Sequence, residues 1–307
     1  MRVVVTGGLG HIGSRLLRNS TFITHAEEVI IVDNLMSKAF PSLFNLKSRK
    51  FRLVEGNVEE MVTPEIMDGV SAVVHLAAIA DPERSIAQPT LVREHNVRGT
   101  RRVVEMCLLQ GTPIVFPSTT SVYGGVDSAI CESTAVLSPS TPYAQCKLEE
   151  EAIVAAGRAQ GLPAITLRLG TIFGPSMGMR FHTAVNRFCW QAVTGRPITV
   201  FRNAMNETRP YLYVGDAAEA IAKIVSSAQF SGEVVNLATT NATVAEVVEG
   251  IRSVVAGLSV DVVEARSAGR DSFGVSTEKA ERLGISFRGD LREGIKETIH
   301  LLEGLRP

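Results

Sequence analysis

The sequence predicts an α/β protein built on a doubly wound parallel sheet, with a smaller mixed α/β lobe beside it. Short apolar runs alternate with segments long enough for helices in the first half of the chain, which is typical of a parallel sheet covered on both faces. A glycine-rich turn follows the first of these runs, as at a strand-to-helix junction. After residue 169 the alternation loosens, which indicates a second lobe.

Six apolar runs are the expected strands of the sheet. Each is three or four residues long, and the segments between them can hold crossover helices, as parallel strands require. The runs cover residues 3–5, 29–32, 51–54, 72–75, 114–116 and 164–167.

The second lobe is expected to begin with a loop and a helix. Gly174, Pro175 and Gly178 mark the loop, a helical pattern covers 181–193, and a turn at 195–197 leads into a short strand. These elements no longer follow the regular alternation of the first half, so they are expected to lie outside the parallel sheet.

The chain is then expected to return to the first lobe. Runs at 211–214 and 234–237 again resemble sheet strands, and the last patterns lie around 244–255 and 291–302. The expected division is a dinucleotide-binding lobe at 1–169, rejoined at about 212–238, and a second lobe at 170–211 and 239–307.

Composition narrows the class of protein. The 307 residues are 45% hydrophobic and 21% charged, which is ordinary for a globular enzyme. A net charge of -1 provides no field that would attract nucleic acid or an anionic membrane, so neither is an expected partner. The chain reaches Gly7 after three valines and has no membrane-length apolar run, so we expect a cytoplasmic protein.

The glycine turn predicts a phosphate-binding junction. Gly7, Gly10 and Gly13 lie three residues apart after the first expected strand and open a helical pattern. Gly7 permits a tight turn, Gly10 lets the backbone approach a pyrophosphate, and Gly13 allows close packing. A glycine turn without a ligand is the alternative interpretation.

An acidic residue after the second expected strand supports the ligand interpretation. Asp33 follows Gly13 by about 20 residues, where a carboxylate can bind both hydroxyls of an adenosine ribose and repel a 2′-phosphate. Strand, turn, helix and acid occur in the order of a Rossmann site. The sequence therefore predicts NAD as the cofactor.

A tyrosine and a lysine later in the chain predict general-base chemistry. Tyr143 and Lys147 are four residues apart and share a face if the segment is helical. A nearby cation favours the ionised phenol. An isolated pair of this kind is usually an exposed helix face, but its position downstream of the glycine turn and of Thr119 favours catalysis.

The segment 116–124, which reads FPSTTSVYG, together with Tyr143 and Lys147, resembles the extended short-chain dehydrogenases/reductases. More narrowly, it resembles the nucleotide-sugar epimerase/dehydratase family and its UDP-glucose 4-epimerase-like members. That family's pattern is a hydroxyl residue, Val-Tyr-Gly and then Tyr-x-x-x-Lys. Further matches, in the family's order, lie at 75–78, 96–100, Arg168, 174–175, Arg209 and 213–216.

The resemblance implies roles for three catalytic residues. Tyr143 would remove a proton from a sugar hydroxyl, and Lys147 would lower the pKa of Tyr143 while binding the nicotinamide ribose. Thr119 would hydrogen-bond the same sugar hydroxyl. Such positioning and pKa tuning are what proton removal near neutral pH requires.

The resemblance also implies a set of cofactor-binding residues. For the small apolar members, core packing is an equally good explanation. Relatives usually carry aspartate at position 57, but an amide can also accept a hydrogen bond from an adenine amino group. The implied residues are Gly7, Gly10, His11, Ile12 and Gly13 at the pyrophosphate turn, Asp33 and Asn34 at the ribose, Asn57 and Val58 at the adenine, and Leu76, Ala77, Ala78, Asn96, Tyr143 and Lys147 around the pocket.

The residues before Val122 favour one reaction within the family. Relatives that dehydrate or decarboxylate a sugar generally carry an acid there, whereas this chain has Thr120 and Ser121. An epimerase needs no such acid. The resemblance therefore implies epimerisation at carbon 4 of a UDP-hexose through a 4-keto intermediate. Alternatives are a dehydratase, an NAD(P)-dependent reductase or dehydrogenase, and a non-catalytic NAD-binding sensor.

Substrate contacts are also implied by the resemblance. Arg209 matches an arginine that binds the nucleotide diphosphate, Arg180 could add charge from the loop, and Thr171 replaces the customary asparagine. A surface ion pair and a solvated loop are the alternatives for the two arginines.

Two expectations concern metals and assembly. The six histidines show no metal-ligand spacing, so no metal site is expected. Helical patterns at 91–109 and 148–156 resemble the helices through which relatives form a homodimer, although both could equally cover the sheet of a monomer.

Overall fold

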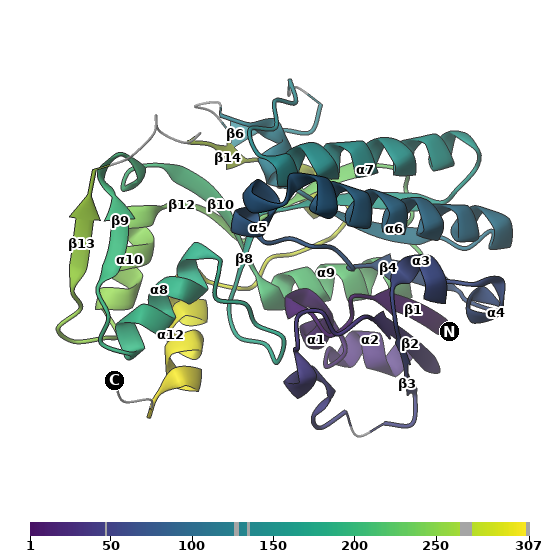
Figure 1. Ribbon diagram of the computed structural model, residues 1–307, viewed down its shortest axis with the longest axis horizontal. Coiled ribbons are helices and arrows are strands. Elements are labelled where there is room, and N and C mark those ends of the chain that lie inside the picture. Colours follow the sequence, from purple (N-terminus) through teal and green to yellow (C-terminus); the bar gives the residue numbers. More distant parts are fainter. Residues whose placement is uncertain (47, 126–128, 134–135, 265–271, 305–307) are drawn as a thin grey trace.

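A seven-stranded sheet, parallel throughout, forms the centre of the larger lobe (Figure 1). The computed structural model describes residues 1–46, 48–125, 129–133, 136–264 and 272–304. The strand order is β11-β7-β5-β4-β1-β2-β3, which confirms the predicted doubly wound fold. The strands are β1 (Arg2–Thr6), β2 (Glu28–Asp33), β3 (Phe51–Glu55), β4 (Ala72–His75), β5 (Ile114–Thr119), β7 (Ala164–Leu169) and β11 (Val234–Leu237).

The order of the strands reverses at β1. The chain passes from β1 outward to β2 and β3, then crosses back to β4 on the other side of β1. Thr6 at the end of β1 is the register partner of both Val32 and His75, so the strands end at one edge. A crevice outside the carboxyl ends at such a reversal is where doubly wound sheets bind ligands.

Helices cover both faces of this sheet (Figure 1). Each face is sealed by its own apolar cluster, and strand residues such as Val3, Val4 and Val5 are fully buried. One face carries α1 (His11–Leu16), α2 (Ser20–His25), α9 (Val214–Ser226) and α11 (Glu278–Arg282). The other carries α3 (Val58–Met61), α4 (Pro64–Met67), α6 (Pro89–Gln110) and α7 (Pro142–Ala159), with α5 (Pro82–Ala87) ahead of α6.

The smaller lobe has its own sheets and core. Its three-stranded sheet has the order β12-β10-β8 and pairs β10 parallel to β8 and antiparallel to β12. Its elements are β8 (Thr171–Phe173), α8 (Ala184–Val193), β9 (Ile198–Phe201), β10 (Thr208–Tyr213), β12 (Thr240–Thr243), α10 (Val244–Arg252), β13 (Val260–Val263) and α12 (Leu291–Leu302). Strands β9 and β13 form a parallel pair, as do β6 (Ala129–Ile130) and β14 (Gly274–Val275). Three short 3-10 helices, η1 (Phe40–Leu43), η2 (Thr120–Tyr123) and η3 (Arg202–Ala204), complete the described elements.

The predicted strands are present, but the sequence pattern misplaced one run and the start of one helix. All six predicted strands are present, most of them longer by one to three residues. Of the run at 211–214, residues 211–213 end β10 and belong to the three-stranded sheet, whereas Val214 begins α9. Helix α7 begins at Pro142, earlier than the apolar pattern at 148–156, because Thr141 caps its first turn by accepting a hydrogen bond from the Ala144 amide.

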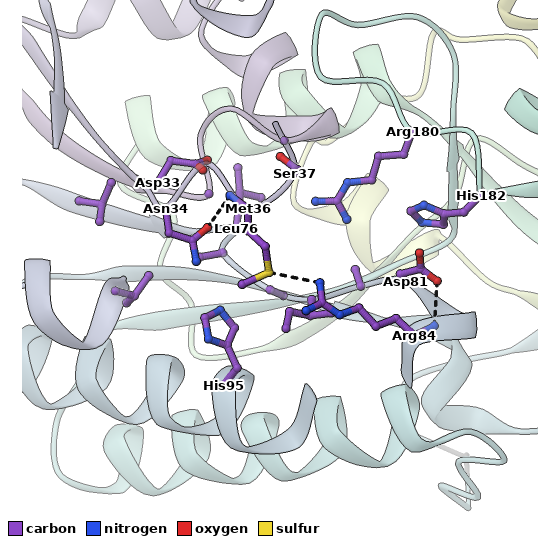
Figure 2. Close-up of a pocket in the computed structure, with 18 of the residues that line it drawn as sticks. Asp33, Asn34, Met36, Ser37, Leu76, Asp81, Arg84, His95, Arg180 and His182 are labelled. Atoms are coloured by element: carbon purple, nitrogen blue, oxygen red, sulfur yellow. Dashed lines mark hydrogen bonds between the residues drawn. The ribbon is translucent and has the colours of Figure 1, made fainter. Parts of the chain in front are cut away.

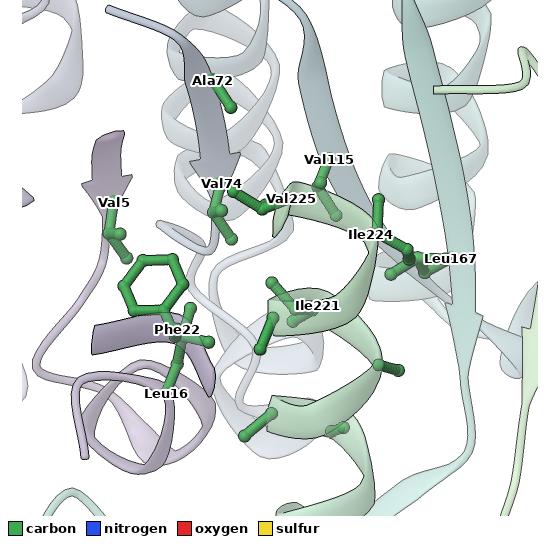
Figure 3. Packing of buried hydrophobic residues seen from close by; sticks show 14 of the residues in the cluster. Val5, Leu16, Phe22, Ala72, Val74, Val115, Leu167, Ile221, Ile224 and Val225 are labelled. Carbon is green, nitrogen blue, oxygen red and sulfur yellow. The ribbon is translucent and has the colours of Figure 1, made fainter. Parts of the chain in front are cut away.

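The core beneath the sheet depends on large side chains from short helices. Figure 3 shows Phe22 of α2 beside Val5 of β1, with Ile221 of α9 in the same cluster. Phe22 is fully buried, although α2 has only six residues. A helix this short has little stability alone, so its position depends on this packing.

Replacing Phe22 tests that dependence. Phe22→Ala should lower the free energy of unfolding by about 3–5 kcal/mol, because the substitution removes a buried ring and leaves a cavity. Phe44→Ala is the matched control, since Phe44 is 57% exposed, and it should change stability by less than about 0.5 kcal/mol. Urea unfolding measures both, and equal effects would show that α2 does not rely on Phe22.

Candidate active site

The glycine turn lies between β1 and α1 and is packed tightly. Gly7 has a φ of 65° and donates a hydrogen bond to the Val32 carbonyl at 2.8 Å. A Cβ on Gly7 would lie 2.6 Å from the Ala77 backbone, and one on Gly13 would lie 2.5 Å from the Gly8 carbonyl oxygen. Side chains larger than hydrogen therefore do not fit at these two positions without movement of the backbone.

Asp33 at the end of β2 is buried and fixed in place. One carboxylate oxygen accepts a hydrogen bond from the Leu9 amide at 3.0 Å, and the other accepts one from the Leu35 amide at 2.9 Å. The first of these bonds ties the acid directly to the glycine turn. The carboxylate is held at the carboxyl edge of the sheet, where the sequence predicted it.

A cavity of about 400 Å³ opens at this edge of the sheet. In Figure 2, Asp33, Asn34 and Leu76 lie on one side of it, and Arg180 and His182 reach in from the loop after β8. Eight of the residues predicted to bind the cofactor line the cavity: Gly7, Gly10, Asp33, Asn34, Val58, Leu76, Ala77 and Ala78.

Three predicted cofactor residues, Ile12, Gly13 and Asn57, are not part of the cavity lining. Ile12 packs against the apolar cluster on the face of the sheet covered by α1, and Gly13 packs against Gly8. The side-chain oxygen of Asn57 accepts a hydrogen bond from the side-chain Nδ2 of Asn34 at 2.9 Å. A carbonyl oxygen has a second lone pair, so this bond leaves Asn57 able to accept another donor.

Asn96 supports the lining from behind. It is buried and forms two hydrogen bonds with the backbone of Ile79, accepting from the amide at 2.8 Å and donating to the carbonyl at 3.2 Å. Ile79 itself lines the cavity. Asn96 thus fixes the β4-to-α5 segment rather than lining the space directly.

His11 connects the glycine turn to the smaller lobe. Its Nε2 donates a hydrogen bond to the Gly174 carbonyl at 2.8 Å, and burial lowers the pKa of His11 to about 4, with Arg180 and His182 acting in the same direction. The imidazole is therefore neutral at physiological pH. In the structure this side chain holds the loop 174–180, and its predicted place at the pyrophosphate stays a prediction.

Further bonds hold that loop against α1. Ser176 donates to the His11 carbonyl at 2.9 Å, and the Gly178 amide donates to the Ser14 hydroxyl at 2.9 Å. A Cβ on Gly178 would lie 2.3 Å from the Leu9 carbonyl oxygen. The loop that carries Arg180 is thus fixed on the glycine turn, and an Arg180 nitrogen lies 3.6 Å from where a Gly10 Cβ would be.

Several lining residues were not singled out from the sequence. Arg84 contacts the Met36 sulfur at 3.3 Å, and its backbone amide is capped by Asp81 (Figure 2). These residues come from separate segments that meet only in the fold. The sequence did contain a signal for the start of α5, because Asp81 followed by Pro82 is a typical helix start. The lining residues outside the predicted set are Val32, Met36, Ser37, Gly56, Ile79, Ala80, Asp81, Arg84, His95, Met179, Phe181 and His182.

The predicted catalytic residues come from β5 and α7. Thr119 is the last residue of β5, and Tyr143 lies in the first turn of α7, one turn before Lys147. The Thr119 hydroxyl donates to the Ser121 hydroxyl at 3.2 Å. None of the three residues is part of the cavity lining described above.

Lys147 is almost completely buried and paired. Its ammonium donates to Glu150 at 3.0 Å and to the Pro117 carbonyl at 3.2 Å, and it lies 4.8 Å from the centre of the Phe116 ring. Burial alone would lower the pKa of Lys147, but Glu150 and Tyr143 outweigh burial and raise it. The lysine therefore remains charged.

The pKa of Tyr143 departs from the sequence expectation. Burial raises the pKa of this phenol, and although Lys147 lowers it as expected, the net direction without cofactor is upward. Arg180 acts in the same direction as Lys147, while Glu150 and Cys146 oppose them. Sequence spacing identified the cation but not the desolvation that competes with it.

The predicted substrate residues are divided between two places. Arg180 lines the cavity, whereas Thr171 and Arg209 do not. Arg209 forms an ion pair with Glu207 at 3.1 Å and its guanidinium lies 5.6 Å from the centre of the Phe273 ring. Arg209 is thus part of a partly exposed ion pair in the structure, and its contact with a diphosphate stays a prediction.

The described part of the chain shows neither a metal-binding cluster nor a membrane-spanning helix. No group of three or more His, Cys, Asp or Glu side chains there is arranged to hold a metal ion. In the same residues, no helix has the length and apolar character needed to cross a bilayer.

The parallel sheet, the glycine turn and the acid after β2 define a Rossmann-type dinucleotide-binding enzyme fold. Residues 3–238 match the model of the NAD dependent epimerase/dehydratase family. The chain belongs to this family, which confirms the resemblance noted in the sequence. Its members include nucleotide-sugar epimerases and dehydratases that depend on NAD.

Individual relatives include both epimerases and a dehydratase. The chain is 28% identical over 251 residues to an uncharacterized UDP-glucose epimerase of Bacillus subtilis (strain 168), with 77% of this chain and 76% of that protein covered. The Thermus thermophilus UDP-glucose 4-epimerase in complex with NAD has a TM-score of 0.83 at 26% identity, over 99% of both chains. The Streptomyces venezuelae dTDP-glucose 4,6-dehydratase with NAD has a TM-score of 0.86 at 26% identity, over 98% of this chain and 96% of that one.

The residues of the cavity fit NAD. Gly7 and Gly10 leave a stretch of backbone without side chains at the start of α1, where a pyrophosphate would be held. Asp33 presents a carboxylate suited to ribose hydroxyls, and Arg180 brings a cation close to Gly10. NAD is the cofactor of the family, as the sequence predicted.

Arg180 should contribute to NAD affinity because its guanidinium lies beside Gly10 in the cavity. Arg180→Gln should weaken NAD binding roughly tenfold or more, since a charge-assisted hydrogen bond contributes about 1.5–3 kcal/mol. Isothermal titration calorimetry measures the loss. Arg187→Gln on α8 is the control, because Arg187 does not line the cavity. Unchanged NAD affinity in Arg180→Gln would assign this arginine to another ligand.

Proposed function

We propose that the protein is an NAD-dependent nucleotide-sugar epimerase that inverts carbon 4 of a UDP-hexose. The observation that carries the proposal is the set Thr119, Tyr143 and Lys147 without a carboxylate in the two positions before Val122. Thr120 uses its hydroxyl to donate to the Leu169 carbonyl at 3.3 Å, and Ser121 bonds to Thr119. An extra proton transfer, as elimination requires, therefore has no acid or base at these positions.

In the proposed reaction, Tyr143 as phenolate accepts the proton of the sugar 4-hydroxyl. Thr119 turns its hydroxyl from Ser121 to the sugar oxygen, and the Lys147 ammonium stabilises the phenolate. A bound NAD would supply the acceptor, and later the donor, for the hydride of carbon 4. The 4-keto sugar would present its other face before the hydride returns, and Tyr143 would give the proton back, so the enzyme and NAD end each turnover unchanged.

We propose that Thr171 and Arg209 contact the nucleotide diphosphate. Support comes from the small sheet, where Thr171 of β8 is the register partner of Tyr211 on β10, two residues from Arg209. Arg209 is already oriented by Glu207. A fixed guanidinium suits paired phosphate oxygens, and the relatives that bind UDP-sugars favour the nucleotide.

A dehydratase is the second candidate, favoured by the similarity to the Streptomyces venezuelae enzyme. It differs from the epimerase in its product, because water is lost and a 4-keto-6-deoxy sugar accumulates. The polar but neutral pair Thr120 and Ser121 argues against it.

Incubation with UDP-glucose and UDP-galactose distinguishes these reactions. We expect interconversion of the two sugars without added cofactor and without net formation of NADH. Chromatography measures the interconversion of the sugars, and absorbance at the NADH band measures net formation of NADH. A released keto-deoxy sugar would indicate the dehydratase, and accumulation of NADH would indicate a dehydrogenase.

Tyr143→Phe should lower kcat by at least about 10²-fold, because the general base is removed. NAD binding should remain, since the cavity is unchanged. Tyr213→Phe makes the same chemical change at a hydroxyl that bonds to Glu297 and should keep nearly full activity. Turnover of Tyr143→Phe at the normal rate would refute the role of this tyrosine.

A further inference from the structure

A buried glutamate lies directly behind the lysine of the proposed catalytic pair. Glu150 is on α7, three residues after Lys147, and its side chain is fully buried. One carboxylate oxygen accepts from Lys147 at 3.0 Å and from the Thr100 hydroxyl at 2.7 Å. The other oxygen accepts from the Cys146 thiol at 3.4 Å. Neither the sequence motif nor the proposed reaction uses this residue.

A chain of hydrogen bonds links Glu150 to the strand that precedes the glycine turn. Thr100 lies 3.1 Å from His75 Nε2, and His75 Nδ1 lies 2.7 Å from the Thr6 hydroxyl. Because Thr100 donates to Glu150, it must accept from His75 Nε2, and so His75 Nδ1 accepts from Thr6. Burial lowers the pKa of His75 to about 3, with Lys147 and His95 acting in the same direction, so the ring is neutral.

The contacts of Glu150 place a hydrogen-bond donor at each of its two oxygens. Lys147 and Thr100 donate to one oxygen, and Cys146 donates to the other. A fully buried charge is costly unless it is paired and hydrogen-bonded. Here the ammonium of Lys147 is the paired charge, so the carboxylate and the lysine depend on each other.

We propose that Glu150 is a positioning residue of the active site, whose buried carboxylate holds the Lys147 ammonium and offsets part of the positive charge that acts on Tyr143. The inference rests on the proposed function for the role of Tyr143 as base. It is independent of which sugar is converted, because all of its contacts lie inside the protein.

The charges around Tyr143 determine the direction of the effect. From α7, Lys147 lowers the pKa of Tyr143, while Glu150 and Cys146 raise it, and from the loop after β8, Arg180 lowers it. Glu150 also raises the pKa of Lys147. Removing the carboxylate charge should therefore lower both pKa values, and a bell-shaped pH profile should move to lower pH on both sides.

Glu150→Gln tests this effect while retaining an oxygen that can accept from Lys147. The titration of Tyr143, followed as tyrosinate absorbance in NAD-loaded protein with Tyr143→Phe as the blank, should move to lower pH by on the order of 0.5–1 unit. Glu149→Gln is the matched control on the preceding residue, because Glu149 pairs with Arg93 at the surface. It should not move the titration.

An unmoved tyrosinate titration in folded Glu150→Gln overturns the proposal, as does an equal shift in Glu149→Gln. Absence of epimerase activity in the wild type would instead count against the proposed function, and the tyrosinate measurement does not depend on it.

A second variant tests whether Glu150 holds the Lys147 ammonium in place. Glu150→Asp keeps the charge but is one methylene shorter, so it should lower kcat several-fold with KM and NAD affinity nearly unchanged. If Glu150→Gln does not fold, this variant decides alone, and a kcat equal to that of the wild type overturns the proposal.

Discussion

The site depends on one constraint, the reversal of strand order at β1. Because β1, β2, β4 and β5 are parallel, their carboxyl ends meet at the same edge. Asp33 ends β2 and Thr119 ends β5. The glycine turn follows β1. Residues from distant parts of the sequence thus converge on one edge of the sheet, where Asp33 and the glycine turn line the cavity and Thr119 lies outside its lining.

Helix α7 contributes to this site through buried charges as well as through its first turn. Its two consecutive buried glutamates point to different partners, since neighbouring helix positions do not share a face. Glu150 pairs with Lys147, while Glu151 forms two bonds with Arg168 of β7, at 2.6 and 3.0 Å. The pair of Glu151 with Arg168 anchors α7 to β7, so it fixes the position of the helix that carries Tyr143 relative to the sheet.

Sequence alone predicted the fold and much of the cofactor cavity, because those features follow local patterns. The runs of apolar residues, the spacing of the glycines and the distance to Asp33 can each be recognised within short windows. The ion pair of Arg209 with Glu207 and the support of Ile79 by Asn96 could not be predicted in this way. Burial around Tyr143 was also missed, because desolvation arises from residues that are distant in the chain.

The bonds between α1 and the loop 174–180 join the two lobes at the place where both would meet ligands. His11 and Ser14 lie on α1, and Gly174 and Gly178 lie on the loop that also carries Arg180 into the cavity beside the glycine turn. A displacement of this loop would therefore act directly on α1 and the glycine turn through these hydrogen bonds. Thermodynamic linkage makes coupling between two ligands reciprocal, so a ligand that changed the affinity for the dinucleotide by some factor would have its own affinity changed by the dinucleotide by the same factor.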